Sequence, residues 1–248
     1  VLLWSPIFGD QKVDFTALFA SGWKARIVLT NETEYVARAI AQRQRVQKPH
    51  FGTRMIATLS LGHSIGLGIV TDRYGARPTA IAPPFGHMTH LPDGPWCRCG
   101  ERGCIEAYAG FYAILRTTFE GPDQTIPAKF VPLAEMDKIA AKARAGHRMA
   151  QFAFRTAGEV LGVGISRLMS LHGAMPIAIT GPGLAYYDLM QPSFEAALKG
   201  NLQLRLTSMP EISLHMDQEN LVFEGNVTAS LSHLDETALA AGRREENE

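Results

Sequence analysis

Three cysteines lie within a stretch of eight residues, and they constrain the fold of this chain more than any other feature of its sequence. They are Cys97, Cys99 and Cys104 in the passage "GHMTHLPDGPWCRCGERGCIEAY", and the rest of the chain contains none. The spacing C-x-C-x4-C, with Gly100 and Gly103 between the thiols, allows one loop to wrap several sulfurs around a single centre. We therefore expect a bound metal ion rather than three separate buried thiols.

Zinc is the metal that such a loop would suit. A structural zinc site takes four nitrogen or sulfur ligands at roughly 2.0 to 2.3 Å, usually in a tetrahedron. Three thiolates leave one position for a histidine, and both His87 and His90 precede Cys97 closely enough to fill it. There are two alternatives. The thiols could serve only in packing, or two of them could form a redox pair, although a disulfide between Cys97 and Cys99 would close an unusually tight ring.

The composition is that of a soluble globular protein without a strong charge. Of the 248 residues, 46% are hydrophobic and 19% are charged, and the formal net charge is zero. Such a chain has no basic surface that would hold nucleic acid unaided. It has no apolar run of about 18 residues that would predict a membrane span, and its opening "VLLWSPIFGD" lacks the features of a signal peptide. We therefore expect no membrane contact and a cytoplasmic location, where thiols stay reduced.

Alternating strand and helix patterns predict an α/β fold. The run "KARIVLT" predicts a strand that ends at Thr30, and residues 31–47 predict a helix with Asn31 as its N-cap. Two strand-like runs joined by a glycine-rich turn follow in "RMIATLSLGHSIGLGIVTDRYG". The stretch from Met136 to Leu171 is predicted to be helical, "MPIAIT" a buried strand, and "LAYYDLM" a helix after a "GPG" turn. The tail predicts the start of another helix at Leu234.

The cysteine passage resembles the hallmark of the ROK family (repressors, open reading frames and kinases). That hallmark reads G-H and, ten residues on, C-x-C-G-x-x-G-C-x-E. This sequence matches it at Gly86, His87, Cys97, Cys99, Gly100, Gly103, Cys104 and Glu106. In the family, the histidine of the G-H pair and the three cysteines bind zinc. The resemblance therefore implies that His87 is the fourth ligand and that His90 is not.

The resemblance extends over nearly the whole chain. "SLGHSIGLGIV" is similar to the family's glycine-rich phosphate turn, and "PIAITGPG" to its late nucleotide-side strand and turn. These similarities imply a nucleotide- or phosphate-binding role for Gly62, Gly66, Gly181 and Gly183. The implied fold is the actin-like, ribonuclease H-like ATPase fold of ROK proteins. The chain would hold a remnant of the first lobe and the lobe junction in 1–30, the sugar-binding and zinc lobe in 31–235, and the start of the C-terminal helix and tail in 236–248.

The sugar site implied by the resemblance consists of Asn31, Glu32, His87 and Glu106. "LTNETEY" lies where the family carries Asn-Asp, so Glu32 would occupy the position of the catalytic base. A glutamate places its carboxylate one methylene further out, and a shift of roughly 1 Å can cost about a hundredfold in rate. The alternative is that Glu32 and Glu34 only stabilise a helix N-terminus.

Two other positions depart from the kinase pattern. Family kinases usually carry G-T-G-x-G in the phosphate turn, whereas this chain has His63 and Ser64 between Gly62 and Ile65. Members that bind sugar usually show G-E-x-G-H, and here Pro84 replaces the carboxylate, whose loss weakens a pocket built on hydroxyl contacts. A glycine-rich β-turn without any ligand is the alternative for the first of these stretches.

These observations favour a carbohydrate-sensing ROK transcriptional regulator, and an ATP-dependent sugar kinase for a hexose or N-acylhexosamine is the alternative. A zinc-stabilised assembly domain without a ligand is a third hypothesis. The regulator would bind a small carbohydrate here and DNA through a segment that is not in this chain. ATP would be a cofactor only of the kinase. The family's D-x-G-G-T loop, or a winged helix-turn-helix, is expected upstream of Val1, and the resemblance implies a homodimer or homotetramer.

Overall fold

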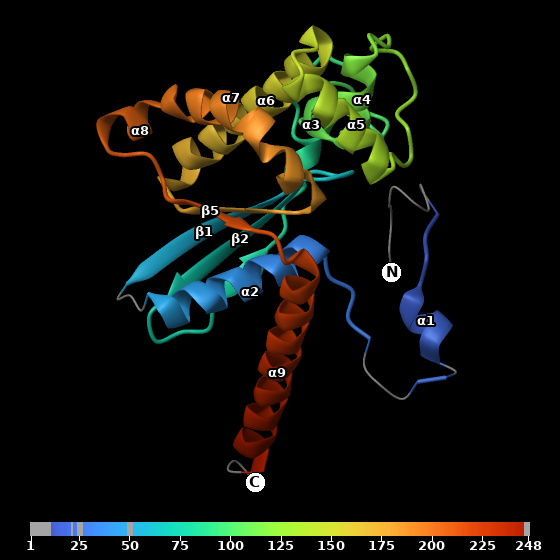
Figure 1. Cartoon of the computed structure of the whole chain (residues 1–248). Coiled ribbons are helices and arrows are strands. Elements are labelled where there is room, and N and C mark those ends of the chain that lie inside the picture. Colours follow the sequence, from blue (N-terminus) through green and yellow to red (C-terminus); the bar gives the residue numbers. More distant parts are fainter. Residues whose placement is uncertain (1–10, 21, 24–26, 49–51, 246–248) are drawn as a thin grey trace.

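The computed structural model describes residues 11–20, 22–23, 27–48 and 52–245 (Figure 1). Its strands are β1 (Thr53–Ser60), β2 (Gly66–Arg73), β3 (Thr79–Ile81), β4 (Ile177–Thr180) and β5 (Ile212–His215). Its α-helices are α1 (Phe15–Ala20), α2 (Glu32–Gln47), α3 (Glu106–Ala109), α4 (Phe111–Thr118), α5 (Leu133–Arg144), α6 (Arg148–His172), α7 (Tyr187–Lys199), α8 (Leu202–Leu206) and α9 (Gln218–Glu245). Two short 3-10 helices, η1 (Phe85–His87) and η2 (Pro182–Tyr186), precede α3 and α7.

The five strands form one mixed sheet in the order β3-β2-β1-β4-β5. β1 and β2 pair as an antiparallel hairpin from Thr53↔Arg73 to Ser60↔Gly66, which confirms the two predicted strands and the glycine-rich turn between them. β4 lies parallel to β1, and β5 lies parallel to β4. The carboxyl ends of β1, β4 and β5 therefore meet at one edge of the sheet, where open α/β sheets commonly bind ligands.

Helices cover both faces of this sheet (Figure 1). Leu59 and Ile179 belong to the larger core, which they share with α4, α5, α6 and α7. Ile56 and Ala178 point to the opposite face and pack against α2. Successive residues of a strand face opposite sides, so strands covered on both faces are apolar throughout. This arrangement confirms the α/β prediction.

α2 forms as predicted. Asn31 is its N-cap, and the Asn31 side chain accepts a hydrogen bond from the backbone N–H of Thr33 at 3.0 Å. Val36 and Ile40 are fully buried on the face toward the sheet and α9. α9 packs against α2 near Leu221 and then extends away from the sheet (Figure 1). Of the helices in the described residues, none has the length and apolar character needed to cross a bilayer.

The predicted strand ending at Thr30 is wrong for its described part. Residues 27–30 form no strand and pair with none in the described chain, and residues 24–26 lie outside the described residues. Val28 and Leu29 are 57% and 49% exposed, so their β-branched and apolar pattern has no sheet to enter here. Strand propensity describes how well a residue fits a half-buried surface, and without such a surface it does not act.

Two predicted helix boundaries are also wrong. The helix expected from Met136 to Leu171 is divided into α5 and α6, because Gly146 between them has φ of 95°, a left-handed conformation that ends a helix. The last helix begins at Gln218 rather than Leu234. Its first turns present Leu221 and Val222 to α2 between polar residues, so their apolar pattern is weak in the sequence. The division of the chain at residues 30 and 235 stays a prediction.

Candidate metal centre and ligand site

η1 and the loop that connects it to α3 hold the four side chains of the Cys/His cluster, which consists of His87, Cys97, Cys99 and Cys104. η1 carries His87 at its end. Two isolated β-bridges then fold the loop back on itself, one between Thr89 and Cys104 and one between Trp96 and Arg102. These bridges pair residues 15 and six positions apart in the sequence, and the first brings the two ends of the loop together.

The glycines of the motif give the loop its tight curvature. Gly100 has φ of 91° and Gly103 has φ of 71°, both left-handed conformations that residues with a Cβ rarely adopt. A Cβ at Gly103 would also collide with the carbonyl oxygen of Leu91. The motif therefore requires glycine at these positions for the path of the backbone.

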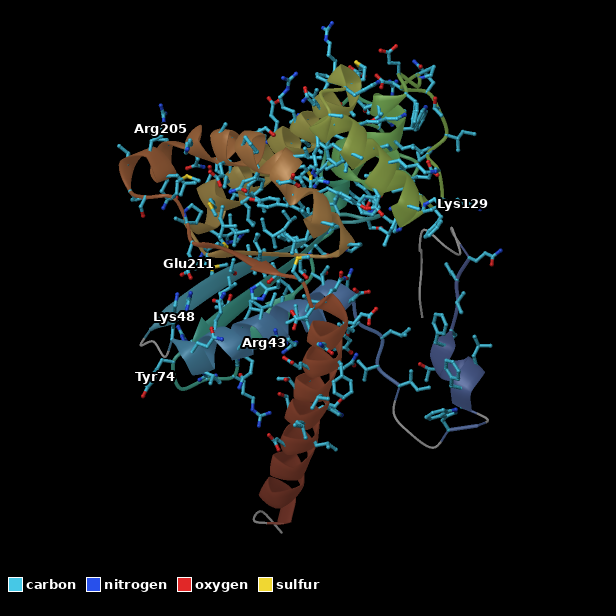
Figure 2. The ribbon with its side chains drawn as sticks, viewed as in Figure 1. Arg43, Lys48, Tyr74, Lys129, Arg205 and Glu211 are labelled. Atoms are coloured by element: carbon cyan, nitrogen blue, oxygen red, sulfur yellow. The ribbon has the colours of Figure 1, made fainter. Side chains whose placement is uncertain are left out.

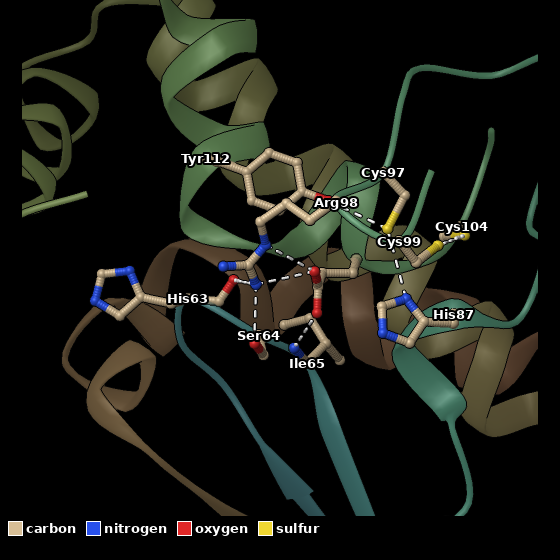
Figure 3. A network of polar contacts seen from close by, with 10 residues as sticks. His63, Ser64, Ile65, His87, Cys97, Arg98, Cys99, Cys104 and Tyr112 are labelled. Atoms are coloured by element: carbon tan, nitrogen blue, oxygen red, sulfur yellow. Dashed lines mark hydrogen bonds and ion pairs between the residues drawn. The ribbon is translucent and has the colours of Figure 1, made fainter. Parts of the chain in front are cut away.

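The geometry of the Cys/His cluster fits a tetrahedral metal ion. Its four ligand atoms all lie within 4.8 Å of one another, and all three cysteines are free thiols. The sulfurs of Cys99 and Cys104 are 3.7 Å apart, and Nδ1 of His87 is 3.5 Å from the sulfur of Cys97 (Figure 3). Two sulfurs about 2.3 Å from one zinc ion at a tetrahedral angle would be about 3.8 Å apart. The cluster could therefore hold zinc with little movement.

Burial controls the protonation of these thiols. It raises the pKa of Cys97 to about 11, and burial together with the neighbouring sulfurs raises the pKa of Cys104 further. Cys97 and Cys104 are therefore neutral near pH 7 in the absence of a cation, and a metal ion would displace their protons. The hydroxyl of Tyr112 donates to the sulfur of Cys97 at 3.6 Å, and burial raises the pKa of Tyr112, which keeps this donor protonated.

His90 does not join the cluster. Its ring packs edge-on against Tyr108, with 5.3 Å between ring centroids, and its backbone N–H donates to the carbonyl of Gly103. Burial and the charge of Arg167 lower the pKa of His90, so the ring is neutral near pH 7. Of the two histidines that the spacing left open, the structure brings His87 to the sulfurs, as the family resemblance implies.

Glu106 is buried in an ion pair. The side chains of Arg98 and Glu106 are 8% and 2% exposed, and Nη2 of Arg98 is 2.9 Å from Oε1 of Glu106. The other carboxylate oxygen, Oε2, accepts the backbone N–H of Ile65 at 3.1 Å. The predicted sugar contact thus already satisfies two groups of the protein, one of them in the glycine-rich turn.

Arg98 is the residue that the sequence analysis missed. Besides Glu106, its Nη2 donates to the carbonyl of His63 at 2.6 Å and to the hydroxyl of Ser64 at 2.8 Å (Figure 3). Its guanidinium carbon lies 5.0 Å from the ring centroid of Tyr112. One signal in the sequence could have pointed to Arg98. It is a long cationic residue between two candidate metal ligands, so a bound metal would hold its backbone in place.

The two glycine-rich turns lie side by side at the carboxyl ends of β1 and β4. The N–H of Leu61 donates to the carbonyl of Thr180 at 2.9 Å, and the N–H of Gly183 donates to the carbonyl of Leu61 at 2.8 Å. These turns are 62–66 and 181–183. The structure therefore brings together the two stretches that the family resemblance identified separately.

The predicted phosphate-site glycines are also needed for packing. A Cβ built at any of them would meet other protein atoms closely, and these positions are Gly62, Gly66, Gly181 and Gly183. At Gly66 it would collide with the side chain of Thr33, and at Gly181, where φ is 97°, with the carbonyl of Leu61. Their glycine identity is thus explained by the close approach of the two turns to each other and, at Gly66, by contact with α2, with or without a phosphate.

Asn31 and Glu32 lie at the N-terminus of α2, and both are exposed. The carboxamide oxygen of Asn31 accepts the N–H and the hydroxyl of Thr33, at 3.0 and 2.7 Å. Oε1 of Glu32 accepts a hydrogen bond from Nε2 of Gln218 at 2.6 Å. Thr33 packs on Gly66, so the first turn of α2 lies against the 62–66 turn, which Glu106 contacts from α3.

The remaining departures from the kinase pattern occupy the protein surface. His63 lies between Phe111 and Phe130, with ring centroids 5.0 and 4.7 Å away, and burial lowers its pKa. Ser64 is exposed but accepts the Arg98 hydrogen bond. Pro84 is exposed at the start of η1 and offers no side-chain acceptor.

Two kinds of protein, sugar kinases and transcriptional repressors, are similar in sequence to this chain. A glucokinase of Thermotoga maritima is 34% identical over 123 residues, which cover 49% of this chain and 38% of that protein. The DNA-binding transcriptional repressor Mlc of Escherichia coli is 23% identical over 194 residues, 77% of this chain and 46% of the repressor. The chain spans half or less of the length of these two relatives, which include both a kinase and a repressor.

The fold has solved counterparts. A ROK family glucokinase from Streptomyces griseus, in complex with glucose and AMPPNP, matches 91% of this chain and 75% of its own at a TM-score of 0.62 and 21% identity. This similarity shows that the chain has the α/β, actin-like fold of ROK proteins. The sequence model of the ROK family matches residues 5–222. The chain therefore belongs to the ROK family.

Proposed function

We propose that this chain is the carbohydrate-sensing portion of a ROK transcriptional regulator, with a structural zinc ion in the Cys/His cluster. The observation that carries this proposal is the state of the 62–66 turn. In a phosphate cradle, backbone N–H groups point at the phosphate oxygens. Here the N–H of Ile65 donates to the carboxylate of Glu106, and Arg98 binds the carbonyl of His63 and the hydroxyl of Ser64.

A buried ion pair already engages this turn, since Glu106 accepts the N–H of Ile65 and Arg98 binds the carbonyl of His63 and the hydroxyl of Ser64. A phosphate would have to break this pair to use the same groups, and breaking a buried ion pair is costly. A sugar requires no such change, because its hydroxyls can use the remaining lone pairs of the carboxylate. The turn therefore suits ligand sensing better than phosphoryl transfer.

The zinc would hold the loop that carries the sugar-facing groups. His87, Cys97, Cys99 and Cys104 would be its ligands, and their chemistry and spacing suit a closed structural site. Glu106 follows the last cysteine by two residues and begins α3. Fixing the loop therefore fixes the direction of this carboxylate, while Asn31 and Glu32 approach from α2.

The regulator would bind DNA through a segment outside this chain, since the chain has no net charge to attract it. It would act in the cytoplasm, where the thiols stay reduced and able to bind zinc. A homodimer or homotetramer is part of the same proposal. None of these properties is needed for the binding of a sugar by this chain.

An ATP-dependent sugar kinase is the second candidate, and one observation favours it. The turns 62–66 and 181–183 lie together at the carboxyl ends of adjacent parallel strands, the usual position for a nucleotide in an α/β sheet. Glu32 would then accept the proton of the sugar hydroxyl, and ATP would be the phosphoryl donor.

Titration calorimetry with common hexoses and N-acylhexosamines, together with a coupled assay of ATP consumption, tests the proposal. We expect at least one sugar to bind, with no turnover of ATP above that of a Glu32→Gln control. Binding should weaken in Glu106→Gln, because the neutral amide is a weaker acceptor for hydroxyls. If sugar-dependent ATP consumption is seen and Glu32→Gln abolishes it, the regulator proposal is wrong and the kinase proposal takes its place. Absence of binding by all the sugars would favour the assembly domain.

A further inference from the structure

Arg98 connects two parts of the site that are far apart in the sequence. It lies between the candidate metal ligands Cys97 and Cys99, and its side chain is only 8% exposed. The turn that it reaches, at His63 and Ser64, is 35 and 34 residues away along the chain. A charged side chain is rarely buried unless its charge and its donors are matched, so this contact is specific.

The donors of Arg98 are matched on both sides of the site. Nε and Nη2 donate to Oε1 of Glu106 at 3.1 and 2.9 Å, on the side of the metal loop. Nη2 also donates to the carbonyl of His63 and the hydroxyl of Ser64, on the side of the turn (Figure 3). The planar guanidinium is suited to holding several acceptors in a fixed direction.

The groups that hold Arg98 on the side of the metal loop are linked to the Cys/His cluster. Its own backbone lies between two of the sulfurs, and Glu106 follows Cys104 by two residues. The ring of Tyr112 lies against the guanidinium, and its hydroxyl donates to the sulfur of Cys97. A cation bound by the cluster would therefore hold both the backbone of Arg98 and the positions of Glu106 and Tyr112.

We infer that Arg98 is a positioning residue that makes the conformation of the 62–66 turn depend on the metal ion in the Cys/His cluster. This inference rests on the metal centre of the proposed function. With zinc bound, Arg98 and Glu106 hold the turn from both its carbonyl and its N–H groups. Without zinc, the loop loses its crosslink, the ion pair loses its fixed geometry, and the turn opens more often.

Hydrogen exchange of the backbone amides tests the inference, with zinc content measured in the same samples. The native chain is compared after loading with Zn²⁺ and after treatment with a chelator. We expect the amide of Ile65 to exchange about tenfold or more faster without zinc, the factor typical for losing a hydrogen bond to a charged group. In zinc-loaded Arg98→Ala, exchange at Ile65 should already be fast, and the chelator should add little.

Two further variants separate positioning from a general loss of structure. Arg102→Ala is the matched control, because Arg102 lies in the same loop but donates to the carbonyls of Gly94 and Asp93 and not to the turn. It should keep the native exchange rate at Ile65. Arg98→Lys should give an intermediate rate, because an ammonium can pair with Glu106 but lacks the fork of the guanidinium.

The outcomes are distinguishable. If the native chain binds zinc and Ile65 exchanges equally fast with and without it, the inference is overturned and the metal centre stands. An unchanged rate in zinc-loaded Arg98→Ala also overturns it, as does acceleration in Arg102→Ala equal to that in Arg98→Ala. A native chain that binds no zinc overturns both the metal centre and the inference.

Discussion

Two histidines of similar burial precede the cysteines, and their surroundings give them different chemistry. Nδ1 of His87 faces the sulfur of Cys97 at 3.5 Å, whereas the ring of His90 packs against Tyr108. A metal ion needs a ligand atom directed at it, and burial alone does not supply one. The assignment of His87 as a zinc ligand can therefore be tested against a neighbour of the same residue type.

Replacing His87 with alanine should greatly reduce zinc binding, and replacing His90 with alanine should leave it unchanged. The first variant removes one of four ligands, and the second removes a ring outside the cluster. Zinc per chain after dialysis, measured by atomic emission, reports the difference. Equal zinc content in the two variants would show that the histidine does not complete the site.

The sequence was sufficient to identify the four residues of the Cys/His cluster but not their surroundings. The spacing of the cysteines and the family resemblance identify the cluster because the motif is local to the loop. Arg98 could not be assigned in the same way, because its partners His63 and Ser64 come from a distant turn. When the role of a residue depends on a contact with a distant part of the chain, no periodicity or spacing in the nearby sequence indicates that role.

At the scale of the elements, Arg43 joins α2 to α9 (Figure 2). It contacts Glu224 at 2.7 Å and Asp217 at 2.8 Å, and these hydrogen bonds lower the pKa of both carboxyls. Carboxyls with a lowered folded-state pKa stabilise the fold above their ordinary pKa of about 4, and this contribution is lost as the pH falls through the lower folded value. All three groups are partly exposed, so the effect is modest.

Arg43→Ala should therefore reduce the dependence of stability on pH between about pH 5 and pH 2, because the two carboxyls return to their ordinary pKa. Urea unfolding of the native chain and the variant at several pH values measures this slope. About 1 M NaCl should shrink the difference, since it reduces the screening length to about 3 Å. Parallel stability curves for the two proteins over this range would contradict the coupling of α2 to α9 through Arg43.

Gly146 separates α5 from α6, and the separation depends on its backbone conformation. In the part of the chain that the structure describes, no non-neighbouring atom lies within 4 Å of a Cβ built there, so the obstacle to a side chain is its φ of 95°. Gly146→Ala should destabilise the fold by about 1 kcal/mol, the cost of a left-handed conformation for a residue with a Cβ. Gly22→Ala is the control, since Gly22 also has open space and lacks a left-handed φ. Urea unfolding should show no loss for Gly22→Ala, and equal losses would reject this explanation.

The elements that the sequence predicted well are those whose partners bury an obvious apolar face. α2, β1, β2 and β4 combine strong patterns with clear caps or turns. Residues 27–30 have an equally clear strand pattern, but the described chain offers them no neighbouring strand. The start of α9 was missed although its sequence carries apolar residues at helical spacing, and these side chains are exposed in the structure: Phe223, Val227, Leu231 and Leu234.

At the scale of the whole molecule, the α/β class followed from the sequence, whereas the order of the strands did not. β1 pairs with β4 through contacts such as Ala57↔Ile177, which join distant parts of the chain. Such pairings depend on which helices cover each face, and local patterns do not encode them. The family resemblance supplied the actin-like fold, and the structural similarity confirms that fold.

Removal of zinc should lower the stability of the entire fold, because a ligand that binds only the folded state stabilises it. With free zinc a thousandfold above its Kd, this contribution is about 4 kcal/mol. A chelator should then lower the Tm of the native chain by roughly 10 °C. Calorimetry of Cys104→Ser should show a similarly low Tm, with no further decrease on adding the chelator. A chelator effect in Cys104→Ser as large as in the native chain would place the stabilising metal elsewhere.

X-ray absorption at the zinc edge of the purified native chain is the most direct test of the metal centre. The account predicts one zinc ion per chain, with three sulfur ligands at about 2.3 Å and one nitrogen ligand at about 2.0 to 2.1 Å. A shell made of oxygen atoms, fewer than three sulfurs around the metal, or cysteines joined as a disulfide would contradict it.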